Sequence, residues 1–399
     1  MDVFLGEWAN LLLRWAHLVV GIGWIGTSFY FIALDYSLDT GERKSPGVYG
    51  TAWQVHGGGF YHVEKFTVAP PRLPERLHWF VWEAYLTWVT GFGLLIVQYY
   101  LQAGVYLIDP NVLALAPWQA GAISVVALGA GWATYDGLCR SPIGRHVGLL
   151  AISVFGLILG SAVLFTHVFS GRGAFVHVGA FVGTIMAANV FAVIIPNQKK
   201  MTAQLLRGEE PDGRLGAIGK QRSLHNNYLT LPVLLMMVSG HYACLYTHPQ
   251  SWLIVALILV LGGLIRHFLN RADAGDALRQ YVWAAPLALL ALAGAIYATA
   301  PGAATAPRAA VDVAGSVSDA EARTIVQRHC VMCHAIKPTH EGFAEAPKSI
   351  TLESLDDMKR YAALIFTQAV VNKAMPLGNQ TGMTDAERSR LGQWVGGLK

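Results

Sequence analysis

Charged residues are scarce in this sequence: Asp, Glu, Lys and Arg make up only 14% of its 399 residues, against about a quarter in a soluble globular domain. Because 54% of the residues are hydrophobic, the composition argues against an ordinary soluble enzyme and favours an integral membrane protein. The net charge is only +4 and no dense basic patch occurs, so we expect no nucleic-acid partner. The four cysteines are too few and too scattered for a disulfide scaffold.

Long apolar runs fill most of residues 1–300. A bilayer core needs about 20 apolar residues of helix. Eight runs meet this requirement, at roughly 8–36, 78–101, 118–138, 147–169, 174–196, 228–246, 252–269 and 281–300. Several are rich in Gly and Ala, which allow helices to approach closely in lipid. The sequence therefore predicts an all-α fold in which residues 1–300 form an eight-helix transmembrane bundle surrounded by membrane lipid.

Lys and Arg lie in alternate loops of this region. Loops 37–77, 139–146 and 197–227, with the turn around 270–280, hold sixteen of them, whereas the remaining loops hold Arg172 alone. Loops rich in Lys and Arg stay in the cytoplasm. We therefore expect a multi-pass protein of the bacterial inner (cytoplasmic) membrane with both chain termini outside.

The composition changes after Thr299. Residues 301–317 are rich in Ala, Pro and Gly without apolar periodicity, which predicts a linker. Residues 318–399 are polar with helical patterns, and Cys330-Val-Met-Cys333-His334 is the attachment motif for a c-type haem. The two thiols bond covalently to the haem and His334 binds its iron. This predicts a small class I-like mono-haem cytochrome c domain in the periplasm.

The second iron ligand is expected to be Met375, which lies before a proline in an extended loop. Methionine and histidine together raise the reduction potential of a haem. Met358, Met383 and Met332 are the alternatives, and the last sits inside the attachment turn. Two capped helices flank the motif and the loop; their predicted N-caps are Ser318 and Thr384. A zinc or redox Cys-x-x-Cys site is the competing interpretation.

Ionisable residues inside a bilayer are costly and therefore point to function. Five lie near the outer ends of the predicted spans: Arg14, His17, His167, His177 and His241. Arg14 and His17 share a helix face. We therefore consider a haem b as a second cofactor, with two histidines on its iron, His17 as the favoured ligand and Arg14 pairing with a propionate. Alternatively, the histidines only hydrogen-bond between helices.

A second polar set lies on the cytoplasmic side. The stretch 53–65 combines His56, His62 and Lys65 with aromatic residues and three consecutive glycines, which let a backbone approach a neighbour closely. His225, Asn226 and Asn227 open the sixth span at the same depth. Each residue alone is better explained as a solvated loop residue or a helix cap than as a catalytic residue. Together they predict a substrate pocket.

These stretches resemble the membrane-bound, cytochrome-c-fused urate oxidases (urate hydroxylases) of bacterial purine breakdown. The resemblance covers most of the chain and rests on WAHLVVGIGWIGTSFYFIALD (15–35), WQVHGGGFYHVEKF (53–66), PERLHWFVWEAYLTWVTGF (74–92), IIPNQ (194–198), HNNYLTLPVLLMMVSGHY (225–242), CVMCH and AMPLGNQTGMTDAER. It implies oxidation of urate to 5-hydroxyisourate. It also implies that electrons pass to the c-haem and then to a terminal oxidase or a soluble cytochrome c, without hydrogen peroxide.

Urate is a flat anion rich in hydrogen-bonding groups, so its site needs a base, donors for its carbonyl oxygens and an aromatic surface. For these tasks the candidate residues are His56, His62 and His225 as bases, Asn226 and Asn227 for the purine edges, Lys65 for the anion, and Phe60 or Tyr61 for stacking. The main alternative is a quinol-dependent or relay-only membrane cytochrome without a purine substrate. A haem-copper oxidase subunit is excluded, because no adjacent His-His pair occurs.

Overall fold

The computed structural model describes residues 3–41, 47–66, 70, 73–248, 250–300 and 317–398. Most of the predicted linker 301–317 lies outside these ranges, as do the loop residues Arg43, Lys44 and Arg72. Within the described residues the chain is mostly helical, and several of its helices are apolar, as predicted.

The first lobe is built from long helices. They are α1 (Val3–Tyr36), α2 (Trp82–Leu94) with η1 (Leu95–Tyr100), α4 (Pro117–Arg140), α5 (Val147–Thr166), α6 (Gly171–Ala188) with η3 (Asn189–Ile194) and α7 (Ile195–Leu206), α8 (Gly213–Val238), α10 (Ser251–Asp273) and α11 (Ala284–Thr299). Short helical pieces join them: α3 (Ala103–Tyr106), η2 (Pro142–Arg145), η4 (Ser239–His241), α9 (Ala243–Tyr246) and η5 (Leu278–Gln280).

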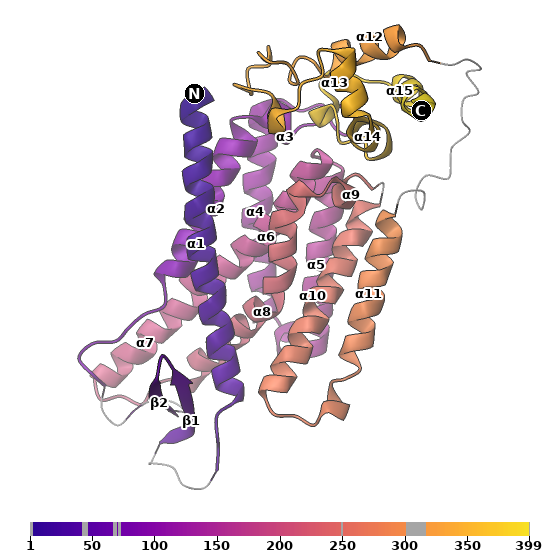
Figure 1. Cartoon of the computed structure of the whole chain (residues 1–399). Helices are drawn as coiled ribbons and strands as arrows, with labels where there is room; N and C mark the ends of the chain where they lie inside the picture. The colour runs from indigo at the N-terminus through magenta and orange to yellow at the C-terminus, as the bar shows by residue number, and fades with distance from the viewer. Residues whose placement is uncertain are drawn as a thin grey trace.

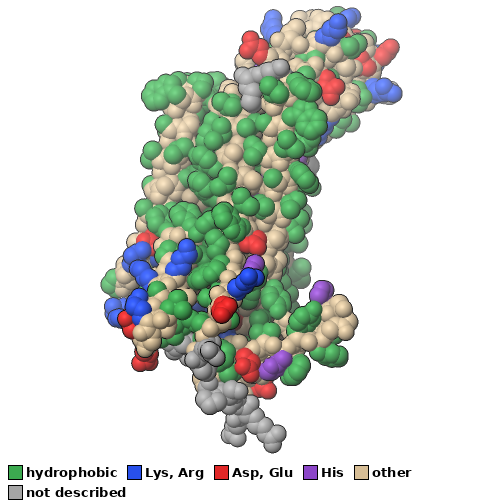
Figure 2. Space-filling model, turned by 90° about the vertical axis from the view of Figure 1, so that its left-hand side faces the viewer, with side chains coloured by type: hydrophobic (Ala, Val, Ile, Leu, Met, Phe, Trp, Pro, Cys, Tyr) green, Lys and Arg blue, Asp and Glu red, His purple; other side chains and the backbone are tan. Residues whose placement is uncertain are grey.

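Helices overlap all eight predicted spans, but five helical segments of the described chain are both long and apolar enough to cross a membrane. They are α1, α4, α5, the continuous α6–η3–α7 segment and α10. Helix α11 is shorter, and α8 has a polar first half. Hydrophobic side chains cover the middle of the face seen in Figure 2, while charged side chains gather towards both ends. These features are compatible with a membrane protein.

The N-terminus and the C-terminal lobe lie at the same end of the helices, as the orientation prediction requires (Figure 1). At the opposite end lie α7 and a β-hairpin. Helix α6 is the most deeply buried of the first lobe and contributes Phe175, Phe181 and Ile185 to its core. Gly131 of α4 packs against Phe181 so closely that a Cβ there would lie 2.0 Å from the ring.

The all-α prediction is wrong for residues 48–66, which form an antiparallel hairpin of β1 (Val48–His56) and β2 (Gly59–Phe66). Gly57 and Gly58 have φ angles of +59° and +80°, and they form the two-residue turn between the paired residues His56 and Gly59. Positive φ at both positions is what a tight hairpin turn demands. No atom lies within 4 Å of a Cβ built at either glycine, so this turn does not serve the close approach predicted for the glycine run.

The prediction of a loop over residues 197–227 is also wrong, because α7 occupies the start of this segment and α8 begins at Gly213 rather than near residue 228. The carboxylate of Asp212 caps α8 by accepting the backbone N–H of Arg214. The structure therefore places Arg222 and His225 inside a helix.

The C-terminal lobe comprises α12 (Asp319–His329), η6 (Pro347–Ser349), α13 (Leu355–Arg360), α14 (Ala362–Ile365), η7 (Phe366–Val371), η8 (Leu377–Asn379) and α15 (Asp385–Gly397). Both predicted caps are confirmed: Ser318 accepts the N–H of Glu321, and Thr384 forms a capping box with Glu387. The indole N–H of Trp394 in α15 donates to Asp319 in α12 at 2.8 Å. The first and last helices of the lobe are thus tied together.

Glu387 makes this lobe sensitive to acid. Its carboxylate accepts the backbone N–H of Thr384 at 2.9 Å and lies 3.1 Å from His329 Nε2. These contacts, the backbone bond foremost, lower the pKa of Glu387 from 4.5 to about 2. Because the folded-state pKa is depressed, the stabilisation is complete above pH 4.5 and is lost as the pH falls towards 2.

We therefore expect hydrogen exchange of the α12 and α15 amides, corrected for intrinsic rates, to accelerate over this pH window in the full chain. Glu387→Gln should exchange faster at pH 7 and show a flatter pH dependence. Glu345→Gln, at an exposed carboxylate, is the control. Equal pH profiles for the wild type and Glu387→Gln would contradict the expectation.

Candidate functional site

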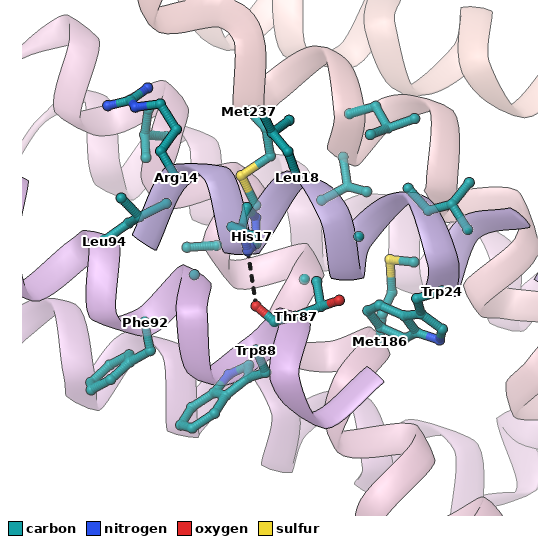
Figure 3. Close-up of a pocket in the computed structure, with 18 of the residues that line it drawn as sticks. Arg14, His17, Leu18, Trp24, Thr87, Trp88, Phe92, Leu94, Met186 and Met237 are labelled. Atoms are coloured by element: carbon teal, nitrogen blue, oxygen red, sulfur yellow. Dashed lines mark hydrogen bonds between the residues drawn. The ribbon is translucent and has the colours of Figure 1, made fainter. Parts of the chain in front are cut away.

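A cavity of about 600 Å³ lies between α1, α2, α6 and α8 (Figure 3). This volume is within the range of about 300–1,000 Å³ that is typical of small-molecule and cofactor sites. Most of its wall is apolar, including Trp24, Trp88 and Phe92. Its polar groups come mainly from residues near the C-terminal lobe's end of the helices: Arg14, His17, Gln98 and His241.

His17 is held against α2. Its Nδ1 lies 3.0 Å from the carbonyl oxygen of Thr87 and 3.1 Å from Oγ1 of Thr90 (Figure 3). A carbonyl only accepts, so Nδ1 carries the hydrogen and Nε2 keeps a lone pair. A Cβ on Gly91 would lie 2.8 Å from Cε1 of His17, so glycine at this position is what allows the ring to come so close to α2.

Arg14 is fixed one turn away on the same helix. Its guanidinium donates to Oε1 of Gln98 at 2.7 Å and to Oδ1 of Asn10 at 3.0 Å. His241, at the end of η4, lines the same cavity. The structure thus brings together Arg14, His17 and His241 of the predicted haem b set.

The other two histidines of that set do not line this cavity. His167 is exposed, and its Nδ1 lies 2.8 Å from the carbonyl oxygen of Val163. His177 is fully buried against Phe165 and Phe169, with Nδ1 2.7 Å from the carbonyl oxygen of Gly173. Its Nε2 has no hydrogen-bond partner among the described residues.

A buried polar network joins α4, η3 and α8 towards the hairpin end of the bundle. Nδ1 of His225 lies 2.7 Å from the hydroxyl of Tyr135, which also accepts from Nδ2 of Asn189 at 3.0 Å. Asn189 donates to Oδ1 of Asn226 at 3.0 Å. The guanidinium of Arg222, only 2% exposed, donates to Asp136 at 2.7 Å. Sequence reasoning missed Tyr135 and counted Arg222 only as a loop charge, because neither shows a local signal.

Asn227 belongs to a different cluster from its neighbour Asn226. Its Oδ1 accepts from Nδ2 of Asn270 at 2.9 Å and from Nε of Arg266 at 3.3 Å. The guanidinium carbon of Arg266 lies 4.1 Å from the centre of the Phe29 ring. In these two clusters, two buried donors have no partner among the described residues, namely Nδ2 of Asn227 and Nε of Arg222.

The hairpin residues of the predicted urate pocket do not converge with these clusters. His56 and His62 are exposed, and the ring of His62 lies 4.5 Å from that of Trp53 on the neighbouring strand. Nζ of Lys65 is paired with Asp35 of α1 at 2.5 Å. The stacking candidates Phe60 and Tyr61 are 77% and 54% exposed. The structure therefore divides the six predicted pocket residues among three places.

The residues of the haem attachment motif have the chemistry that a c-type haem requires. Cys330 and Cys333 are free thiols, and burial raises the pKa of Cys330 to about 12. Nδ1 of His334 lies 2.8 Å from the carbonyl oxygen of Ile350, which leaves Nε2 as the ligand atom and fixes the ring. Among the described residues, no group of three or more His, Cys, Asp or Glu side chains is arranged to hold a metal ion.

Among the candidate sixth ligands, Met358 and Met383 are buried core residues, whereas Met375 is half-buried and packs against the same core, as Cys330 does. The carbonyl of Met375 accepts a hydrogen bond from the buried guanidinium of Arg388 at 2.6 Å. The residues present therefore fit a c-type haem held by both thiols, His334 and Met375.

The loop that follows Met375 lies against the outer end of the first lobe. Gly378 has a φ of +57°, and a Cβ there would lie 2.8 Å from the carbonyl oxygen of Ile108. The side chain of Gln380 donates to the carbonyl of Gly104 in α3. The guanidinium carbon of Arg172 lies 5.0 Å from the centre of the nearby Tyr106 ring. This loop thus lies next to α3 of the first lobe.

Comparison with known proteins adds one match. The family described as urate oxidase N-terminal matches residues 3–298, which are the whole first lobe. No curated protein and no solved structure matches the chain. Since the match covers well over half of the sequence, the chain belongs to the urate oxidase N-terminal family.

Proposed function

We propose that this protein is a membrane-bound, cytochrome c-linked oxidoreductase that oxidises urate to 5-hydroxyisourate. Water adds to the purine while two protons and two electrons leave it. The electrons go to a c-type haem in the protein's own C-terminal lobe and then to a terminal oxidase or a soluble cytochrome c, without hydrogen peroxide. The family match over residues 3–298 carries the urate assignment.

The proposed setting is the bacterial inner membrane, with eight spans and the C-terminal lobe in the periplasm. The apolar helices, the hydrophobic middle of the surface and the shared end of N-terminus and C-terminal lobe support it. A c-type haem is attached outside the cytoplasmic membrane, which agrees with a C-terminal lobe in the periplasm. When bound, the haem supplies one-electron acceptance, and Cys330, Cys333, His334 and Met375 would hold it.

For urate itself we propose the buried network around His225. Buried donors without partners are costly, and Nε of Arg222 is such a donor in this network. Urate presents carbonyl oxygens that such donors can satisfy. His225 is the proposed base, because Tyr135 engages its Nδ1 and no described residue hydrogen-bonds its Nε2. His56, His62 and Lys65 of the hairpin form a second candidate group.

The test is urate addition to the purified, oxidised full-length protein without air, followed at the c-haem absorbance. We expect the haem to become reduced. His225→Ala should slow this reduction by about 100-fold or more, in the range of general-base loss, while His56→Ala should change it only a few-fold. Both variants should keep their c-haem.

The outcomes separate the candidates. Loss of activity in His56→Ala alone would indicate that the urate site lies at the hairpin. Normal rates in both variants would show that neither histidine takes part in catalysis. A haem that quinol reduces but urate does not would favour the quinol-dependent cytochrome instead, for which the apolar cavity offers a binding place.

A further inference from the structure

The proposed reaction removes two electrons from urate, whereas a single haem accepts one. The cavity at Arg14, His17 and His241 lies in the same lobe as the proposed urate site, and its polar groups lie towards the end that carries the C-terminal lobe. With a second one-electron centre in that position, the protein could accept both electrons from urate. This inference deepens the proposed function, although its geometric argument does not depend on the substrate.

We propose that this cavity binds a haem b, with His17 and His241 as the two axial iron ligands and Arg14 paired with a propionate. A histidine that binds a metal almost always donates its other ring N–H to a carbonyl or carboxylate. His17 does so towards Thr87, at 3.0 Å, which leaves Nε2 free for iron.

The two histidines come from different elements of the cavity wall. His17 belongs to α1, and His241 belongs to the turn after α8. Met237, one turn before His241, lines the same cavity as His17 (Figure 3). Ligands from separate elements around one cavity are what a haem needs when it lies between helices of a bundle.

The wall suits a flat, largely apolar molecule with an anionic edge. Gly21, Gly91 and Gly183 from three helices line the cavity. Because glycine has no side chain, the cavity is wider at these positions. The lining contains no Asp or Glu, and its fixed cation is Arg14. The hydrogen bond from Arg14 to Gln98 fixes this guanidinium in the cavity wall, where it can pair with a propionate.

Other occupants fit less well. A quinone has no anionic group for Arg14, and urate lacks an apolar body for Trp24, Trp88 and Phe92. His177, although its Nε2 is buried and unpartnered among the described residues, is enclosed by aromatic rings and does not line the cavity. The structure therefore selects His17 and His241 from the four intramembrane histidines.

The experiment is a pyridine haemochrome spectrum of the purified full-length protein, which distinguishes non-covalent haem b from covalent haem c. We expect one b-type haem for each c-type haem. His17→Ala and His241→Ala should each lose most of the b signal and keep the c signal. His167→Ala, at an exposed histidine outside the cavity, should keep both.

Two further variants distinguish a specific loss of haem binding from misfolding. His17→Met should retain haem b with an altered absorption spectrum, because methionine can replace histidine on iron. Gly91→Val should lower b-haem content, since its side chain would push His17 away. Wild-type protein that contains haem c alone, even when haem is supplied during expression, would overturn the proposal.

Retention of haem b in both His17→Ala and His241→Ala would also overturn it, as would a quinone recovered from the cavity by solvent extraction. These results are distinct from failure of the proposed function. Urate could still reduce the c-haem of a protein without haem b, in which case urate oxidation stands and the second haem is rejected.

Discussion

Replacing Arg222 with alanine is expected to lower the free energy of unfolding of the first lobe by about 3–5 kcal/mol, the cost of leaving one member of a buried ion pair alone. The guanidinium of Arg222 is 2% exposed and lies 2.7 Å from Asp136. It also lies 3.4 Å from Asn189, at the centre of the network that holds His225. The substitution would therefore weaken three helices at once.

Chain unfolding in detergent by denaturant measures this effect. Arg214→Ala is the matched control, because its ion pair with Asp212 is solvent-exposed and should contribute little to stability. The double variant with Arg222→Met and Asp136→Leu should recover much of the loss, since neither charge is then left unpaired. Similar destabilisation by Arg222→Ala and Arg214→Ala would refute the importance of the buried pair.

Arg388→Met is expected to have the second large effect, this time on the C-terminal lobe. The buried guanidinium of Arg388 donates to the carbonyls of Ala369 and Met375 and to Oδ1 of Asn379 at 3.3 Å. Each buried acceptor left without a donor costs about 1–3 kcal/mol, so we expect a loss on the order of 3 kcal/mol. Arg388 is a positioning residue for the Met375 loop.

If Met375 is the sixth ligand, Arg388→Met should also weaken the absorption band of methionine-bound ferric haem and lower the reduction potential. A merely structural role would leave both unchanged in the folded fraction. Lys359→Met, which removes an exposed ion pair with Asp319, should leave stability, band and potential nearly as in the wild type. An unchanged absorption band in folded Arg388→Met would show that Arg388 does not position the iron ligand.

Sequence reasoning worked where the signal is local. Apolar runs located the long helices, and Ser318 and Thr384 were recognisable as caps from the three residues after each. The hairpin was missed although its Gly57-Gly58 turn is also a local signal. The start of α8 was missed because its first half is polar, and hydropathy detects only the apolar part of a helix.

The candidate site was predictable only in part, because its geometry depends on packing between distant segments. Tyr135 and His225 are 90 residues apart in the chain, and no local sequence pattern predicts their contact. Adjacent residues can also diverge: Asn226 faces Asn189, whereas Asn227 faces Asn270. By contrast, Arg14 and His17 share one helical face, which the sequence alone reveals.

Two π-helical turns in the described part of the first lobe, η1 and η3, bear on how such proteins can diverge. Each lets a helix accommodate one extra residue, and π-turns of this kind often occur at functional sites. Deleting that residue would turn the π-turn back into regular α-helix and shift the residues inside the turn around the helix axis. Gln98 in η1 would then leave Arg14, and Asn189 in η3 would leave Tyr135. Relatives that conserve this chemistry should therefore preserve the length of both segments more strictly than their side chains.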